Sequence, residues 1–273
     1  MNPSAAAGPL TAVLVLEQLW QPAPGGSGTY IRELVTGLLN EREVAVRGLA
    51  AWHTSAPDPA WVPDPRLAVD RVRLPRRALY ELWNRARVGP DGSGDVVHAT
   101  TWAIPPRRRR LVVTVHDLAF LRTPEHFTPH GVVYFRRALD IVRAEADQVI
   151  AVSETTAADC ADAGIETSRI RVVPHGVRIP VVDVEAVRRF RTRHHLERPY
   201  VMWCGTVEPR KNLTTLVRAY REIAALTDLD LVLVGPPGWG ATNDEVARLL
   251  SELPEGRVHR LGSLPFDELH AAY

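Results

Sequence analysis

Two cations stand side by side where the sequence changes from an apolar run to an amphipathic one. The run from Tyr200 to Cys204 has the pattern of a buried strand, and Gly205 ends it. Arg210 and Lys211 follow, just before residues 213–225, whose apolar positions recur at helical spacing. Cations beside a helix N-terminus favour an anion such as phosphate. A solvated basic turn is the alternative for these two residues taken alone.

A histidine at the end of another predicted strand is the second candidate. Residues 111–115 form a short apolar run, and His116 and Asp117 come directly after it. In an open α/β sheet, ligands bind beyond the carboxyl ends of the parallel strands. His116 is therefore expected to face a ligand crevice. The alternative is a hydrogen-bonded histidine in a turn.

A glycine-rich stretch that begins Gly25, Gly26, Ser27 follows the first apolar run, residues 11–16, and precedes a helical pattern. Glycines allow a ligand to approach the backbone closely, and Ser27 or Thr29 is expected to cap the helix. The dinucleotide fingerprint G-x-G-x-x-G is incomplete here, and such loops alone are weak signals. A plain structural turn remains the alternative.

Strand-like runs and helical patterns alternate along the whole chain, which predicts an α/β fold with parallel sheets in two doubly wound halves. Ser153 ends one of these strands and is expected to cap the next helix. We place the first domain at 1–178, a linker at 179–198 and the second domain at 199–273. The predicted strands span residues 11–16, 44–51, 67–74, 95–99, 111–115, 147–153, 169–173, 200–204, 229–234 and 258–261.

Composition narrows the class of protein. A chain of 273 residues suggests about two domains, and 45% hydrophobic with 24% charged residues is ordinary for a globular protein. The net charge of +1 gives no support to nucleic-acid binding. Cys160 and Cys204 lack metal-ligand spacing, so we expect both to be small buried residues in a reduced, cytoplasmic setting. The sequence offers no signal peptide and no apolar run of about 18 residues.

The arginine run Arg107 to Arg110 precedes the strand at residues 111–115. Its simplest interpretation is a solvated edge. The alternative is contact with anionic lipid head groups, which would make the protein peripheral to the inner face of the membrane.

The ordered set of motifs at the strand ends resembles one family, the retaining nucleotide-sugar glycosyltransferases of the GT-B fold, of the bacterial glycosyltransferase group 1 type. The resemblance extends over almost the whole chain, and the Glu-Pro-Arg-Lys-Asn segment is its most specific part. The motifs are residues 25–28 (GGSG), His116 with Asp117, residues 147–153, residues 173–177 (VPHGV), residues 205–212 (GTVEPRKN), residues 231–235 and residues 261–262.

The resemblance implies two Rossmann-like domains facing a cleft, and transfer of a hexosyl group, mannosyl in flavour, from a nucleotide-diphosphate sugar. The acceptor would be a hydroxyl of a glycan or lipid-linked molecule in cell-envelope synthesis, with no metal cofactor. By the same resemblance Lys211 contacts the donor diphosphate and Arg210 shares that role. Gly26 and its neighbours lie near the donor phosphate and acceptor, His116 near the transferred sugar, and Ser153 along the cleft.

The sequence also departs from that pattern. Thr206 stands where many members have an arginine after the strand glycine, and the family's Glu-x7-Glu segment is not in this sequence. We therefore expect a C-terminally truncated member, and an inactive homologue that only binds is the second hypothesis. A third, a Rossmann oxidoreductase, needs an acidic residue at a strand end about 20 residues past the glycines. Glu41 and Glu43 lie before their strand instead.

Overall fold

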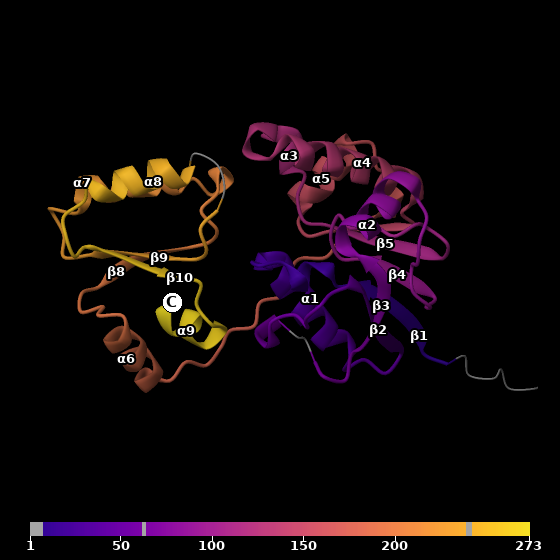
Figure 1. Cartoon of the computed structure of the whole chain (residues 1–273), viewed down its shortest axis with the longest axis horizontal. Coiled ribbons are helices and arrows are strands. Elements are labelled where there is room, and N and C mark those ends of the chain that lie inside the picture. Colours follow the sequence, from indigo (N-terminus) through magenta and orange to yellow (C-terminus); the bar gives the residue numbers. More distant parts are fainter. Residues whose placement is uncertain (1–7, 62–63, 239–241) are drawn as a thin grey trace, which may run out of the picture. The chain divides into compact units, whose positions relative to one another are not determined.

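The structure is a computed structural model that describes residues 8–61, 64–238 and 242–273. Its chain divides into two compact units, one that ends at Gly176 and one that runs from Val177 to Tyr273. Both units contain a parallel sheet with helices on its two faces (Figure 1). The predicted α/β class with parallel sheets is confirmed.

In the described residues of the first unit, seven parallel strands lie in the order β3-β2-β1-β4-β5-β6-β7. The chain builds outward from β1 to β3 and then returns to place β4 on the other side of β1. Such a reversal of strand order leaves a crevice at the carboxyl ends of the two central strands. The strands are β1 (Leu10–Val15), β2 (Val44–Trp52), β3 (Ala68–Pro75), β4 (Val96–Ala99), β5 (Arg110–Val115), β6 (Gln148–Ala151) and β7 (Ile170–Val172).

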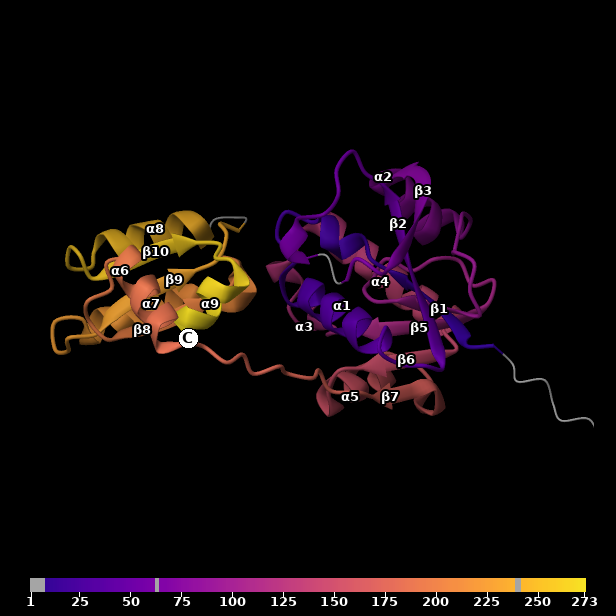
Figure 2. The same cartoon turned by 90° about the horizontal axis from the view of Figure 1, so that it is seen from below.

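Alternation along β1 buries both faces of the first sheet. Ala12 and Leu14 pack against α1, whereas Val13 and Val15 pack on the other face with Leu79 of α2. This two-sided burial explains why the strand appears in the sequence as a continuous apolar run. Figure 2 shows α5 beside β6 and β7 at one edge of the sheet. The helices are α1 (Gly25–Leu38), α2 (Arg76–Glu81, continued by a π-helical turn Leu82–Ala86), α3 (Ala119–Arg122), α4 (Pro129–Glu145) and α5 (Glu154–Asp162).

Helix α1 begins earlier than the glycine pattern suggested. The amide of Gly28 donates to the carbonyl of Pro24, so the hydrogen-bonded helix starts directly after that proline. Ser27 and Thr29 consequently lie inside the first turns, and neither caps the helix. The hydroxyl of Thr29 donates backward to the carbonyl of Gly25 instead, at 3.4 Å. The prediction of a side-chain cap was wrong, because the first backbone hydrogen bond of the helix is accepted by the carbonyl of Pro24.

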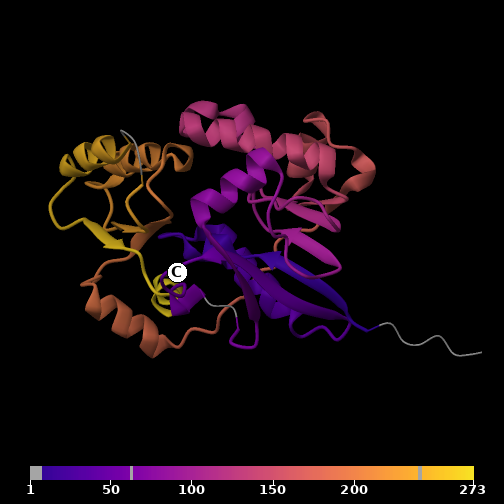
Figure 3. The same cartoon turned by 45° about the vertical axis from the view of Figure 1, so that its right-hand side comes forward.

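The second unit, in its described residues, has a three-stranded parallel sheet in the order β10-β9-β8. Helices α7 and α8 pack on one face with Leu231 and Leu233, and α6 and α9 pack on the other with Val232 and Val234 (Figures 1 and 3). The elements are α6 (Val184–Arg193), β8 (Tyr200–Cys204), α7 (Leu213–Ile223), β9 (Asp230–Val234), α8 (Thr242–Ser251), β10 (Val258–Gly262) and α9 (Phe266–Ala272).

Two details of this unit differ from expectation. Strand β8 is an edge strand, paired only with β9 among the described residues, and its side chains are half-buried rather than buried. Cys204, predicted to be buried, is exposed for that reason, whereas Cys160 is buried as predicted. The segment 179–198 contains α6, and its Phe190 and Leu196 belong to the core around Val232.

Within the described ranges, none of the helices is both long enough and apolar enough to cross a membrane.

Candidate active site

Polar side chains follow neighbouring strands of the first sheet at the same edge. Thr100 follows β4, His116 follows β5, Ser153 follows β6 and His175 follows β7. Helix α1, which starts at Gly25, follows β1. Because every strand pair in this sheet is parallel, these residues gather at the carboxyl edge, beside the point where the strand order reverses.

His116 is held by its two ring nitrogens. Its Nε2 lies 3.0 Å from the carbonyl oxygen of Thr100, and its Nδ1 lies 3.4 Å from Nε2 of His175. Burial lowers the pKa of His116, and this outweighs the opposing effects of the Thr100 carbonyl and of Asp117. The ring is therefore neutral at pH 7. The ring of His116 is hydrogen-bonded within the fold, and it also lies at the carboxyl edge where a ligand was predicted.

Tyr30 ties helix α1 to this histidine. Its ring meets His116 edge-on, with the centroids 5.0 Å apart. Its hydroxyl lies 2.9 Å from Oγ1 of Thr114 in β5, and that oxygen lies 2.8 Å from Nε2 of His98 in β4. The glycine-rich start of α1 is consequently held in a fixed position relative to His116. Sequence reasoning missed Tyr30, His98 and Thr114, because helix and strands are brought together only by folding.

His98 should make stability depend on pH. Burial lowers its pKa to about 4, from an ordinary value of 6.5. Between these values the unfolded chain binds a proton at His98 and the folded chain does not. The contribution of His98 to the stability of the fold is therefore fully present above pH 6.5 and is lost as the pH falls toward 4, by about 3 kcal/mol in all. His116 and His175, whose pKa values are also lowered, act in the same direction.

Urea denaturation at pH 7 and at pH 4.5 measures this loss. His98→Asn should flatten the dependence on pH, whatever its effect on stability at pH 7. An equal loss of stability in the variant and the parent would show that His98 does not carry the effect.

Ser153 caps helix α5, as predicted. Its Oγ accepts from the amide of Thr156 at 3.1 Å and donates to the hydroxyl of that threonine at 3.0 Å. The Thr156 hydroxyl in turn donates to the carbonyl oxygen of His116, at 3.3 Å. Ser153 thus supports the backbone of His116 through one intermediate residue, and its role along a ligand cleft stays a prediction.

The glycines of α1 differ in the space around them. Gly25, at φ +61, and Gly26 are exposed, and a methyl group on Gly26 would meet no atom within 4 Å. A methyl group on Gly28 would lie 2.4 Å from Cβ of Pro24 and 2.9 Å from the ring of Trp61. Gly28 is therefore needed for packing, whereas Gly26 leaves the surface above the helix start open.

Substituting these two glycines should separate folding from ligand access. Gly28→Ala should destabilise the protein by about 1–3 kcal/mol, because the added methyl overlaps packed atoms. Gly26→Ala should leave the unfolding midpoint in urea unchanged while lowering the affinity for a ligand that binds at the start of α1. If Gly26→Ala also leaves ligand binding unchanged, no ligand approaches the start of α1.

The cations of the second unit lie in the turn between β8 and α7. Residues Pro209–Lys211 form a 3-10 turn, and Asn212, at φ +49, leads into α7. The guanidinium of Arg210 donates to the buried carboxylate of Glu208 at 2.7 Å. Lys211 is exposed, and no carboxylate pairs with it among the described residues. The structure therefore distinguishes the two predicted phosphate ligands, since Arg210 already has an ionic partner.

The glycine loop after β9 supports this turn at close range. A methyl group on Gly235 would lie 1.8 Å from the carbonyl oxygen of Gly205, and one on Gly238 would lie 1.7 Å from that of Val207. The amide of Gly205 donates to Val234, and that of Val207 donates to Pro236. The two loops at the carboxyl edge of this sheet are thus packed backbone on backbone.

Lys211 has one further property that sequence reasoning could have used. It is the only lysine in the chain, although the sequence has 33 lysine and arginine residues in all. A lysine offers a compact ammonium group with three donors, whereas a guanidinium is a planar fork. A chain that otherwise uses arginine throughout has a lysine at this one turn.

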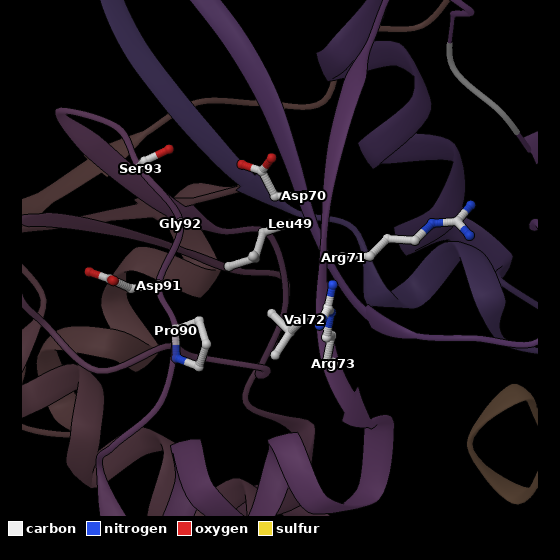
Figure 4. Close-up of a pocket in the computed structure, with 9 residues that line it drawn as sticks. All are labelled: Leu49, Asp70, Arg71, Val72, Arg73, Pro90, Asp91, Gly92 and Ser93. Atoms are coloured by element: carbon white, nitrogen blue, oxygen red, sulfur yellow. The ribbon is translucent and has the colours of Figure 1, made fainter.

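Two other observations concern a pocket in the first unit and the capacity of the chain to bind a metal ion. The pocket in Figure 4 has a volume of about 430 Å³ and lies between β3 and the segment before β4. None of the predicted site residues lines it. In the part of the chain that the structure describes, no group of three or more His, Cys, Asp or Glu residues is placed to hold a metal ion.

The described residues form doubly wound α/β units with polar side chains at the carboxyl edges of their sheets, where proteins of this class bind ligands. Comparison with known proteins agrees. The model of Glycosyltransferase Family 4 matches residues 24–179. The chain belongs to this family, and the resemblance found in the sequence is confirmed at that level.

The individual proteins described next share at most 26% sequence identity with this chain. The chain is 26% identical over 220 residues to O-antigen chain mannosyltransferase B of Escherichia coli, covering 76% of this chain and 54% of the relative. The chain thus spans about half the length of that relative.

Two solved structures show the same fold. HepE of Anabaena, in complex with UDP and glucose, superposes with a TM-score of 0.69 at 18% identity, covering 96% of this chain and 71% of its own. Sucrose-phosphate synthase of Thermosynechococcus elongatus has a TM-score of 0.70 at 20% identity, covering 97% and 73%. The GT-B type of fold predicted from the sequence is confirmed.

Proposed function

We propose that this protein transfers a hexosyl group, mannosyl as the first candidate, from a nucleotide-diphosphate sugar to a hydroxyl of a glycan or lipid-linked acceptor, with retention. The observation that carries the proposal is Lys211, the sole lysine, exposed and unpaired among the described residues at the carboxyl end of β8. The E. coli relative is a mannosyltransferase, which supports a mannosyl group, and the HepE complex with UDP and glucose supports a nucleotide donor.

Each predicted site residue has a role in this proposal. Lys211, with Arg210 as the weaker partner, stabilises the negative charge that develops on the leaving diphosphate. A preorganised donor of this kind is worth about 3–4 kcal/mol. Gly25, Gly26 and Ser27 leave room for the donor phosphate and the acceptor. The residues that this site would use to receive the diphosphate are cations and helix N-termini, so no metal is proposed.

The sugar would lie beside His116 and near Ser153, at the carboxyl edge of the first sheet. We propose a cytoplasmic enzyme of cell-envelope polysaccharide synthesis, with peripheral contact at the inner face of the membrane. Arg108 and Arg109 are exposed and support such a contact, whereas Arg107 is already paired with Asp147 at 2.6 Å.

The single lysine makes a direct test possible. Periodate-oxidised UDP and GDP carry aldehydes that condense with an amine to an imine, with loss of water, and borohydride reduction fixes the product. Peptide mapping should find the label on Lys211, and the unmodified nucleotide should protect against it. Labelling that the parent nucleotide does not suppress, or that spares Lys211, would overturn the donor site.

Turnover separates the two hypotheses about activity. UDP-glucose, GDP-mannose and related donors should yield free nucleotide in the presence of an acceptor. Protected labelling of Lys211 without turnover of any donor would favour the binding-only homologue over the enzyme.

A further inference from the structure

The two histidines at the ends of β5 and β7 form a pair whose hydrogen-bond directions can be assigned. A carbonyl oxygen can only accept, so the contact of 3.0 Å between Nε2 of His116 and Thr100 requires a proton on that Nε2. In the neutral ring, Nδ1 of His116 then has a lone pair. Nε2 of His175, 3.4 Å away, must be the donor in the contact between the rings.

The second ring nitrogen of His175 is thereby also assigned. A neutral His175 that donates from Nε2 has a lone pair on Nδ1. That nitrogen has no hydrogen-bond partner within the described residues, and the side chain of His175 is exposed. Both nitrogens of His116 are already engaged. The free acceptor of this pair therefore belongs to His175 and not to the histidine singled out from the sequence.

Neutrality of both rings is supported by their surroundings. Burial lowers the pKa of His116 and of His175, and the neighbouring His175 lowers the pKa of His116 further. The groups that face the pair are Tyr30 from α1, the neutral His98 from β4 and Asp117, whose carboxylate raises the pKa of His116 without reversing the effect of burial.

The ring of Tyr30 holds the pair in place before any ligand binds. Its centroid lies 5.0 Å from that of His116 and 4.9 Å from that of His175. The two imidazoles are 5.4 Å apart, centroid to centroid. Since Tyr30 is itself fixed through Thr114, the orientation of both rings is set by the fold.

We propose that His175 is the catalytic-site residue that touches the sugar, and that His116 is a positioning residue that fixes its tautomer. This inference rests on the proposed function. An exposed lone pair accepts a hydrogen bond from a hydroxyl, and an ionised phosphate oxygen has no proton to donate. A hydroxyl of the donor hexose fits the free acceptor of His175, whereas the anionic diphosphate fits the ammonium group of Lys211.

Nitrogen-15 spectra of the histidine rings test the assignment without any turnover. At pH 8 both His116 and His175 should be found as Nε2–H tautomers, with single-residue substitutions giving the assignments. Methyl α-mannopyranoside or methyl α-glucopyranoside should shift the resonance of Nδ1 of His175 more than that of either nitrogen of His116. An Nδ1–H tautomer at His175, or no shift with either glycoside, would overturn the proposal.

Two substitutions separate contact with the sugar from support of His116. Asparagine places a polar atom near the position of Nδ1, and glutamine places one near that of Nε2. His175→Asn should keep donor turnover within about threefold of the parent, whereas His175→Gln should lower it by tenfold or more. The reverse order would make His175 only a support for His116.

Binding of UDP or GDP alone should be unchanged in both variants, because the nucleotide lies at Lys211. Loss of protected labelling at Lys211 with the histidine tautomers as assigned would contradict the proposed function but leave the pair as described. The opposite combination would contradict only the role of His175.

Discussion

Lys211→Ala should lower kcat/KM for nucleotide-sugar transfer by about 100-fold, or about 2.7 kcal/mol of transition-state stabilisation. The physical reason is that the ammonium group is exposed and has no ionic partner within the described residues, so its charge is available to the leaving diphosphate. Steady-state kinetics with the best donor measure the effect. Calorimetric titration with UDP or GDP should show at least a tenfold loss of affinity.

Two neighbouring substitutions serve as controls. Arg210→Ala should lower kcat/KM less than Lys211→Ala, because Glu208 already neutralises much of the charge of Arg210. Arg260→Ala removes an exposed cation from β10 of the same unit and should change neither binding nor turnover. Unchanged nucleotide affinity in Lys211→Ala would show that the turn after β8 is a solvated basic turn.

Gly235→Ala should destabilise the second unit by more than about 3 kcal/mol. The new methyl group would lie 1.8 Å from the carbonyl oxygen of Gly205, which is backbone and cannot rotate away. The backbone at Gly235 also has φ +132, a conformation that side chains disfavour. Urea denaturation followed by tryptophan fluorescence, which includes Trp203 of β8, measures the change.

Gly256→Ala is the matched control. Gly256 also has a positive φ, of +74, but a methyl group there meets no atom within 4 Å. This variant should lose only about 1–2 kcal/mol of stability, which is the cost of placing a side chain in the left-handed conformation. Equal losses in the two variants would mean that the contact with Gly205 yields easily and that the loops after β8 and β9 are not tightly packed.

The common edge of the first sheet at which these polar residues lie was predictable from the sequence, because parallel strands place their carboxyl ends at one edge. His116 and Ser153 each end an apolar run, so their position at that edge follows from the strand assignment alone. The capping role of Ser153 was also predictable, since a serine before an amphipathic run commonly bonds a first-turn amide.

The start of α1 and the exposure of Cys204 could not be predicted in the same way. The carbonyl of Pro24 accepts the first backbone hydrogen bond of helix α1, and a residue pattern does not show which carbonyl will do so. Strand β8 has an apolar sequence, but its position at the edge of the sheet leaves Cys204 exposed. Edge and centre depend on strand order, which local periodicity does not report.

The roles within the site were decided by contacts between distant segments. Tyr30 and Thr114 are 84 residues apart, and His116 and His175 are 59 apart. The direction of each hydrogen bond between the histidines follows from the carbonyl of Thr100, a backbone group that every residue possesses. The residue type is the same at both positions, so it does not distinguish His116, whose two nitrogens are engaged, from His175, which has a free nitrogen.

Four features were predictable from the residues: the order of strands and helices along the chain, the α/β class, the family and the polar residues that end the strands. Periodicity and turn residues specify these because they act over a few neighbours in the chain. Only the folded structure shows which strands lie at an edge of a sheet. It also shows that Glu208 forms an ion pair with Arg210 and not with Lys211, and that His175 has the free acceptor nitrogen. Burial, charge pairing and hydrogen-bond direction depend on what folding brings within a few ångströms.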